Sequence, residues 1–262
     1  MVTKRDVVLL LSLVLASFTT VCDAARSGEP TADNLELDPK VAIVQTTTVK
    51  ADRQGHPLYS LGRKIREDEF GTPALVKFVE TMRAIQDRAG GIGLAANQVG
   101  KKLQVFTIEA ASLFSLDGRV PFAVYINPRI LAASTKTRNF MHGCLSSKGS
   151  KRGNVATWEW VDIEARGVKG EKIRKNVTGF EAIIFQHEYR HLLGQNYLDF
   201  AKEFLGPTEL EKAGPGVPHL LGDYTVGQSI EEHHAKSAGV QNKSKSRFKA
   251  TYRRSLRSLQ TE

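Results

Sequence analysis

The chain has 262 residues, of which 25% are charged and 41% hydrophobic, and its formal net charge is +9. This length suits one packed domain with appendages, and it makes two large domains a poor first expectation. The charge is uneven, because residues 236–262 contain eight basic residues and one acidic residue, which leaves about +2 for the rest. The main part of the chain therefore needs no polyanionic partner.

The N-terminus, residues 1–25, has the pattern of a targeting segment. Lys4 and Arg5 precede an apolar run, small and polar residues follow it, and cleavage is expected near Ala24. The run is too short to cross a bilayer comfortably, so we expect no membrane span in the mature chain; a buried N-terminal helix is the alternative. Residues 26–55 are polar and weakly periodic, which predicts a disordered leader or linker.

The folded part is expected to begin near Pro57, although residues 41–44 could form an edge strand. Thr72 followed by Pro73 predicts a helix N-terminus, and apolar residues then recur at helical spacing until Gly90. Further strands are predicted at 103–108, 122–126 (closed by Asn127-Pro128) and 158–165, and a second helix at 180–193.

The C-terminal part gives weaker signals. A short helix is predicted at 208–213, and the stretch rich in glycine and proline that follows predicts loop over 214–235. The folded domain is accordingly expected at 56–213, with loop and basic tail at 214–262. Three apolar residues at four-residue spacing predict that the tail becomes helical on contact with a partner: Phe248, Tyr252 and Leu256.

The strongest chemical signal is the sequence from His187 to His191, which reads His-Glu-Tyr-Arg-His. A four-residue step places both imidazoles on one face of a helix, where they can bind one metal ion. Glu188 would then lie beside the metal and could carry a proton without acting as a ligand. The alternative is a pair of surface histidines, but apolar residues directly before the motif favour a buried helix.

Two histidines leave such a site short of a ligand. Downstream, Glu203 and His219 are formal possibilities, although neither has an obvious spacing. Upstream, Cys144 is the one cysteine expected in the mature chain, because Cys22 lies in the targeting segment, so no internal disulfide is expected. This thiol is a buried core residue, a nucleophile or the third metal ligand. As the third ligand it would leave the fourth coordination position of the metal ion open to water.

A glycine-rich segment, residues 91–100, contributes a third element. It lacks the lysine and the spacing of a phosphate-binding loop, so it reads either as a turn into a buried segment or as a functional loop. Its chemical candidate is Gln98, whose amide could donate to an oxyanion.

Three motifs in this order resemble the signature motifs of the peptide deformylases: GIGLAANQ at 91–98, GCLS at 143–146 and QHExxHLxG at 186–194. The resemblance runs from about residue 57 to 200. It implies an α+β fold with antiparallel sheets packed around the helix of the third motif.

The resemblance also implies a role for each matching position. Glu188 matches the general acid/base, and the Gln98 side chain and the Leu145 backbone N–H match the donors that stabilise the tetrahedral intermediate. The implied ligands of one divalent ion, usually Fe²⁺ with Zn²⁺ or others as substitutes, are Cys144, His187 and His191.

Substrate contacts follow from the same resemblance. Ile92, Gly93 and Gly143 match backbone positions that bind the peptide as an added strand. Arg152 can fill the position of a substrate-contacting arginine. The residues implied to line the pocket for the first side chain, methionine in the family's substrates, are Phe180, Ile183 and Ile184.

The sequence departs from the family at three polar positions. His142 stands where glutamate is usual, Arg190 where aspartate is usual, and Thr157 where arginine is common. We expect these changes to occur together, because a partly satisfied buried network is costly. Since the implied ligands and Glu188 are retained, a competent enzyme with altered substrate preference or stability is expected.

Three functions are compatible with these residues. The first is hydrolysis of N-formyl-methionyl nascent peptides to formate and a free amine. The second is a metalloprotease or amidase that uses the same helix, and the third is an inactive relative that binds peptide N-termini or ribosomes. The basic tail either contacts ribosomal RNA or is simply solvated. We expect a monomer in a eukaryotic organelle, plastid-like or mitochondrial, with the secretory pathway as the alternative.

Overall fold

The structure is a computed structural model of the whole chain, and it describes residues 34–47, 50–111, 118–147, 152–201 and 224–237. The chain divides into two compact units, Met1–Asn34 and Leu35–Glu262, and the described residues beyond Asn34 belong to the second. The predicted targeting segment, the helix at 208–213 and the tail from residue 238 lie outside the described residues. Within them, no helix is long and apolar enough to cross a membrane.

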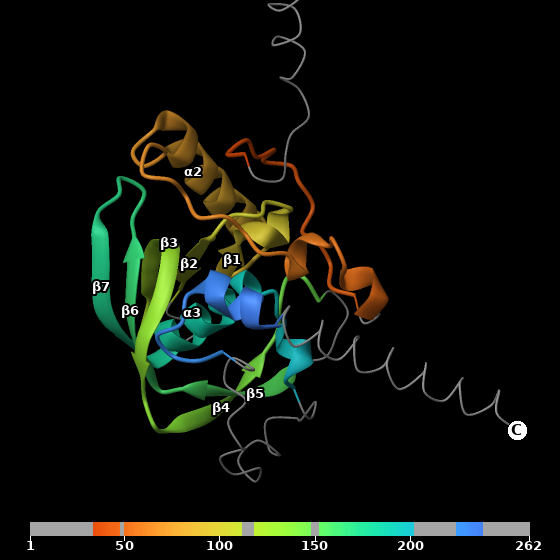
Figure 1. Cartoon of the computed structure of the whole chain (residues 1–262), viewed down its shortest axis with the longest axis vertical. Coiled ribbons are helices and arrows are strands. Elements are labelled where there is room, and N and C mark those ends of the chain that lie inside the picture. The colour runs from red at the N-terminus through yellow and green to blue at the C-terminus, as the bar shows by residue number, and fades with distance from the viewer. Residues whose placement is uncertain (1–33, 48–49, 112–117, 148–151, 202–223, 238–262) are drawn as a thin grey trace, which may run out of the picture. The chain divides into compact units, whose positions relative to one another are not determined.

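The second unit is an α+β fold built on antiparallel sheets (Figure 1). A five-stranded sheet has the order β1-β2-β3-β6-β7, and β4 pairs with β5 in a separate ribbon. The strands are β1 (Gly93–Ala95), β2 (Val105–Ala110), β3 (Val120–Ala133), β4 (Thr137–His142), β5 (Gly153–Trp158), β6 (Trp160–Arg166) and β7 (Lys172–Thr178). The helices are α2 (Pro73–Arg88) and α3 (Gly179–Leu192), with 3-10 turns η1 (Lys50–Arg53), η2 (Pro57–Tyr59), η3 (Ala96–Val99) and η5 (Tyr197–Asp199).

Both long helices form where the sequence predicts them. The Thr72 hydroxyl accepts a hydrogen bond from the backbone N–H of Leu75 at 3.3 Å and caps α2. The predicted strand 122–126 is longer than expected, because β3 continues through Asn127 and Pro128. Asn127 takes a positive φ of 51°, and the pairing register with β6 shifts there, so a bulge accommodates the proline.

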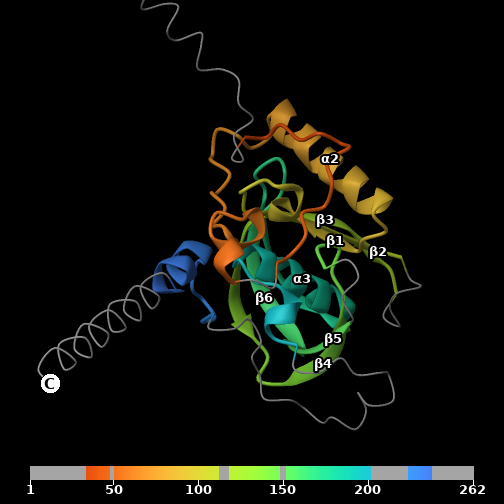
Figure 2. The same cartoon turned by 90° about the vertical axis from the view of Figure 1, so that its right-hand side faces the viewer.

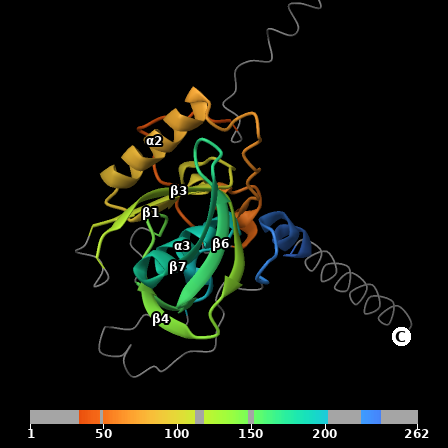
Figure 3. The same ribbon diagram turned by 90° about the vertical axis from the view of Figure 1, so that its left-hand side faces the viewer.

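Alternation along the central strands divides the core between the two helices. Phe106 and Tyr125 point to the cluster around α3, whereas Val105 and Ile126 point to the cluster under α2. Figure 1 and Figure 3 show α2 and α3 on opposite sides of β1 to β3. The helix with the His-Glu-x-x-His motif is therefore enclosed by the sheet and the β4–β5 ribbon.

The segment expected to be a disordered linker differs from the prediction. Residues 41–44 are irregular rather than an edge strand, but Leu35, Leu37, Val41 and Ile43 pack against the core under α2. These four residues are partly buried, and backbone hydrogen bonds from Val44 and Thr46 also join the segment to the rest of the fold.

The predicted loop 214–235 is also wrong in its last part, because residues 230–237 are helical. The hydroxyls of Tyr224 and Tyr189 lie 3.1 Å apart, Ile230 is buried, and His234 Nε2 lies 3.2 Å from the Leu192 carbonyl oxygen. Figure 2 shows this blue helix beside the orange 3-10 turns, separate from the sheet. The folded unit thus extends beyond residue 213 and covers the outer side of α3.

Candidate active site

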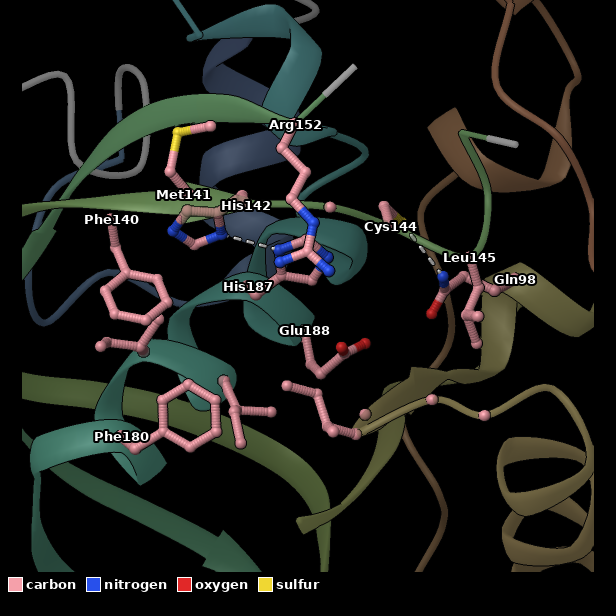
Figure 4. Close-up of a pocket in the computed structure, with 17 residues that line it drawn as sticks. Gln98, Phe140, Met141, His142, Cys144, Leu145, Arg152, Phe180, His187 and Glu188 are labelled. Carbon is pink, nitrogen blue, oxygen red and sulfur yellow. Dashed lines mark hydrogen bonds between the residues drawn. The ribbon is translucent and has the colours of Figure 1, made fainter. Parts of the chain in front are cut away.

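Predicted site residues from separate parts of the chain line one cavity of about 410 Å³ (Figure 4). They come from the turn into β1, from η3, from the end of β4 and the residues after it, and from α3. The predicted residues on its wall are Ile92, Gly93, Gln98, Gly143, Cys144, Leu145, Arg152, Phe180, Ile183, Ile184, His187 and Glu188. The two downstream ligand alternatives, Glu203 and His219, lie outside the described residues.

Cys144 and the two motif histidines form a cluster that fits a metal ion. One ligand atom from each lies within 4.8 Å of the others, and Cys144 Sγ is 3.2 Å from His191 Nε2. His187 and His191 are one turn apart on α3, with ring centroids at 5.2 Å. A thiol with two imidazoles is a donor set that suits Zn²⁺ or Fe²⁺ better than Mg²⁺ or Ca²⁺.

Burial sets the protonation of this cluster. It lowers the pKa of His187 well below its ordinary value and, together with the Arg190 charge, lowers the pKa of His191 to about 3. Both imidazoles are therefore neutral, as a metal ligand must be. Burial and then the Glu188 charge raise the pKa of the Cys144 thiol to about 12, and a cation would act in the opposite direction by stabilising the thiolate.

Glu188 is buried beside this cluster, with its side chain over β1. Burial raises the pKa of its carboxyl well above the ordinary value, and Oε2 has no hydrogen-bond partner among the described residues. The backbone of Gly93 approaches so closely that a Cβ there would lie 2.8 Å from Glu188 Cδ. Glycine at this position therefore leaves room for the carboxyl group.

The amide of Gln98 has a defined orientation. Its Oε1 accepts a hydrogen bond from the backbone N–H of Ala95 at 2.8 Å, so Nε2 points the other way. That Nε2 donates toward Ser146 Oγ at 3.2 Å and toward Cys144 Sγ at 3.4 Å. The site thus has a fixed N–H donor directly next to the thiol (Figure 4).

The three polar departures are all buried and lie on different elements: His142 ends β4, Thr157 lies in β5 and Arg190 lies in α3. His142 Nδ1 lies 3.0 Å from His187 Nδ1, and burial and then the Arg190 charge lower the pKa of His142 to about 3. Arg190 is itself fully buried on α3, which lowers the pKa of its guanidinium to about 9. The Thr157 hydroxyl instead donates to the Arg138 carbonyl across the β4–β5 ribbon at 3.1 Å. Thr157 is therefore satisfied within the ribbon.

Sequence reasoning missed the contribution of β4 to the cavity wall. Phe140, Met141 and His142 all line it, and the rings of Phe140 and Phe180 are 5.8 Å apart. The run Thr137–His142 does not alternate apolar and polar residues as a strand would, because its two apolar residues, Phe140 and Met141, are adjacent. The available signal was the placement of Phe140 and His142 two residues apart, directly before Cys144.

Comparisons with known proteins assign the chain to a family of enzymes. The model of the polypeptide deformylase family matches residues 53–204, which is more than half of the chain. The chain therefore belongs to the polypeptide deformylase family, and it is an enzyme of the peptide deformylase type.

Individual relatives agree with this assignment. A peptide deformylase of Bifidobacterium adolescentis is 34% identical over 188 residues, which cover 67% of this chain and 85% of the relative. Peptide deformylase 1A, chloroplastic, of Solanum lycopersicum is 31% identical over 179 residues, covering 63% and 62%. A Met-Ala-Ser-bound crystal structure of the Acinetobacter baumannii class I type b enzyme superposes with a TM-score of 0.56 at 25% identity, covering 62% of this chain and 99% of that one. These matches confirm the α+β fold class.

Proposed function

We propose that the chain hydrolyses the N-formyl group of N-terminal formyl-methionine in nascent peptides, with one divalent metal ion held by Cys144, His187 and His191. Two observations carry this proposal: the ligand atoms of Cys144, His187 and His191 lie within 4.8 Å of one another, and Cys144 and His187 line one cavity together with Glu188 and Gln98. Fe²⁺ is the ion we favour, and Zn²⁺ matches the same donors. A divalent ion held there supplies a Lewis acid, which lowers the pKa of a water molecule and polarises the formyl carbonyl.

Glu188 is proposed to move the proton. It accepts a proton from the attacking water and gives that proton to the peptide nitrogen, so that the C–N bond breaks into formate and a free amine. Its burial supports this role, since the raised pKa lets the carboxylic acid hold the proton until the nitrogen accepts it.

Charge on the former carbonyl oxygen needs fixed donors. Gln98 Nε2 is oriented before any substrate binds, because Ala95 holds the other end of the amide. The backbone N–H of Leu145, which follows Cys144 directly, is proposed as the second donor. Both stabilise the oxyanion, which exists only after water has attacked.

The peptide is proposed to bind along β1. Among the described strands, β1 lies at one edge of the sheet and pairs with β2, so its outer side can accept an added strand through the backbone of Ile92 and Gly93. On the opposite wall Gly143 follows β4, and Arg152 lies at the exposed rim. The side-chain pocket is apolar and suits an unbranched methionine; it is formed by Phe140, Met141, Phe180, Ile183 and Ile184.

Glu188→Gln tests this function. We expect metal stoichiometry to be unchanged, because Glu188 is no ligand, and formate release from formyl-Met-Ala-Ser to fall by about 10²- to 10⁴-fold. Undiminished release by this variant would contradict the mechanism. Cleavage of unformylated peptides by the wild type would instead favour a general metalloprotease or amidase.

We further propose an organelle as the location, in line with the predicted leader and with the chloroplastic relative in tomato. Formyl-methionine is the start of bacterial, plastid and mitochondrial translation products, so the substrate is available there. The basic tail is proposed to contact the ribosome, and the protein to act as a monomer. A tagged full chain should co-localise with an organelle marker; its appearance in the medium or the cytosol would contradict this.

A further inference from the structure

His142 is in direct contact with one of the proposed metal ligands. It is the last residue of β4, pairs in register with Gly153 of β5, and is only 4% exposed. Its Nδ1 lies 3.0 Å from Nδ1 of His187, and the two ring planes are within 11° of parallel. Figure 4 shows this contact as a dashed line between the two rings.

The contact restricts where the protons of both rings can lie. At 3.0 Å the two nitrogens form one hydrogen bond, in which one donates and the other accepts. His187 has its Nδ1 occupied in this way, so Nε2 is the nitrogen left to bind a metal, and it must present a lone pair. The proton of His187 is then on Nδ1, and the Nδ1 of His142 is the acceptor.

The remaining proton of His142 is consequently on Nε2. That atom is buried with no hydrogen-bond partner among the described residues, which carries a desolvation cost. The hydrogen bond that His142 accepts from Nδ1 of His187 offsets this cost. Such an outer partner fixes both the tautomer and the orientation of a ligating imidazole. His191 has no equivalent partner among the described residues, since its Nδ1 is buried and unbonded there.

We propose that His142 is a positioning residue that holds His187 in the Nδ1–H tautomer with Nε2 directed to the metal. This role rests on the proposed metal site, but it does not depend on which substrate is hydrolysed. It also gives a reason for a histidine at this position: a neutral ring accepts the bond at Nδ1 without adding a negative charge beside the ligands.

Two substitutions of similar shape separate acceptor loss from packing change. In His142→Asn the side-chain oxygen stands where Nδ1 stood, as both are bonded to Cγ, whereas His142→Leu puts a methyl group there. The measurement is Zn²⁺ affinity by competition with a chromophoric chelator. We expect His142→Leu to bind about 10- to 100-fold more weakly, and His142→Asn to stay within about threefold of the wild type. Equal affinity of the Leu variant and the wild type, or equal losses in both variants, would overturn the proposal.

A second readout needs no variant, so it applies even if His142→Leu does not fold. Long-range ¹⁵N–¹H spectra of the zinc-loaded wild type report the tautomer of each histidine. The proposal predicts an Nε2–H ring at His142 and an Nδ1–H ring at His187; an Nδ1–H ring at His142 would refute it. Formate release is assayed separately, because its absence would contradict the proposed reaction and not the tautomer assignment.

Discussion

Gly93→Ala is the perturbation whose effect the structure defines most closely. A Cβ at this position would lie 2.8 Å from Cδ and 2.9 Å from Cγ of Glu188, whereas ordinary contacts begin at 3.4 Å. Gly93 lies in strand β1, paired with Ile108, so its backbone is held by the sheet. The side chain of Glu188 therefore has to move rather than the strand.

The size of that movement sets the expected loss. The Glu188 carboxyl carbon must shift by about 0.6 Å to reach an ordinary contact distance. A displacement of about 1 Å can cost a catalytic group about 10²-fold. We therefore expect kcat/KM to fall by about 10- to 100-fold, which corresponds to about 1.4–2.7 kcal/mol in the barrier. Metal content should not change, because no ligand is touched.

The assay is formate release from formyl-Met-Ala-Ser at matched metal loading, with Gly91→Ala as the control. At Gly91 the new methyl group would meet the end of the half-exposed Leu145 side chain at 2.7 Å, which can rotate away, and the Gly93 carbonyl oxygen at 3.3 Å, just inside ordinary contact distance. We expect the control to lose less than about threefold. Equal kcat/KM in Gly93→Ala and the wild type would refute the reasoning about Glu188, as would equal losses in both variants.

Two further predictions concern stability. Arg63 donates two hydrogen bonds of 2.7 Å to the Glu69 carboxylate, and this lowers the pKa of Glu69 below 4.5. Glu69→Gln should lower the free energy of unfolding by about 1–2 kcal/mol above pH 4.5, and the difference from the wild type should vanish as the pH falls through the lowered pKa. Urea titrations from pH 7 to pH 2 measure this difference. A difference that is independent of pH would contradict the prediction. Deletion of residues 1–47 should lower the free energy of unfolding by about 2–4 kcal/mol relative to deletion of residues 1–33, because the apolar contacts and hydrogen bonds of residues 35–46 are lost. Equal thermal midpoints of the two deletion variants would contradict this prediction.

The second of these predictions arises where sequence reasoning was least successful. The backbone N–H of Val44 donates to the Gln98 carbonyl at 2.8 Å, and that of Thr46 donates to the Ser146 carbonyl at 2.7 Å. The Gln45 side chain also donates to the Leu145 carbonyl at 3.1 Å. These bonds join residues that are far apart in the sequence, so no local pattern could reveal that this segment supports the catalytic loops.

The two long helices and three of the seven described strands, β2, β3 and β6, were predictable because their signals are local. Pro73 after a capping Thr72, and apolar residues at helical spacing, are sufficient for α2. Residues 230–237 gave no comparable signal, because only Ile230 and His233 are deeply buried there. Their helix is instead held by tertiary contacts with α3: His234 contacts the Leu192 carbonyl oxygen, and Tyr224, just before the helix, contacts Tyr189.

The candidate site, like the fold, could be predicted from the sequence only where its signals are local. The spacing of His187 and His191 predicts that both share one helix face, and the lone thiol of Cys144 suggests itself as a partner. The hydrogen bond between His142 and His187 had no such signal, since it depends on how β4 ends against α3. A contact between two elements that are far apart in the sequence, such as β4 and α3, becomes visible only in the three-dimensional structure.

The central claim is tested most directly by formate release from formyl-Met-Ala-Ser before and after metal removal. We predict that protein loaded with Fe²⁺ releases one formate for each new free amine. Turnover should stop when a chelator removes the ion and return when Fe²⁺ or Zn²⁺ is restored. Turnover that survives complete metal removal, or protein with stoichiometric metal that releases no formate, would contradict the account.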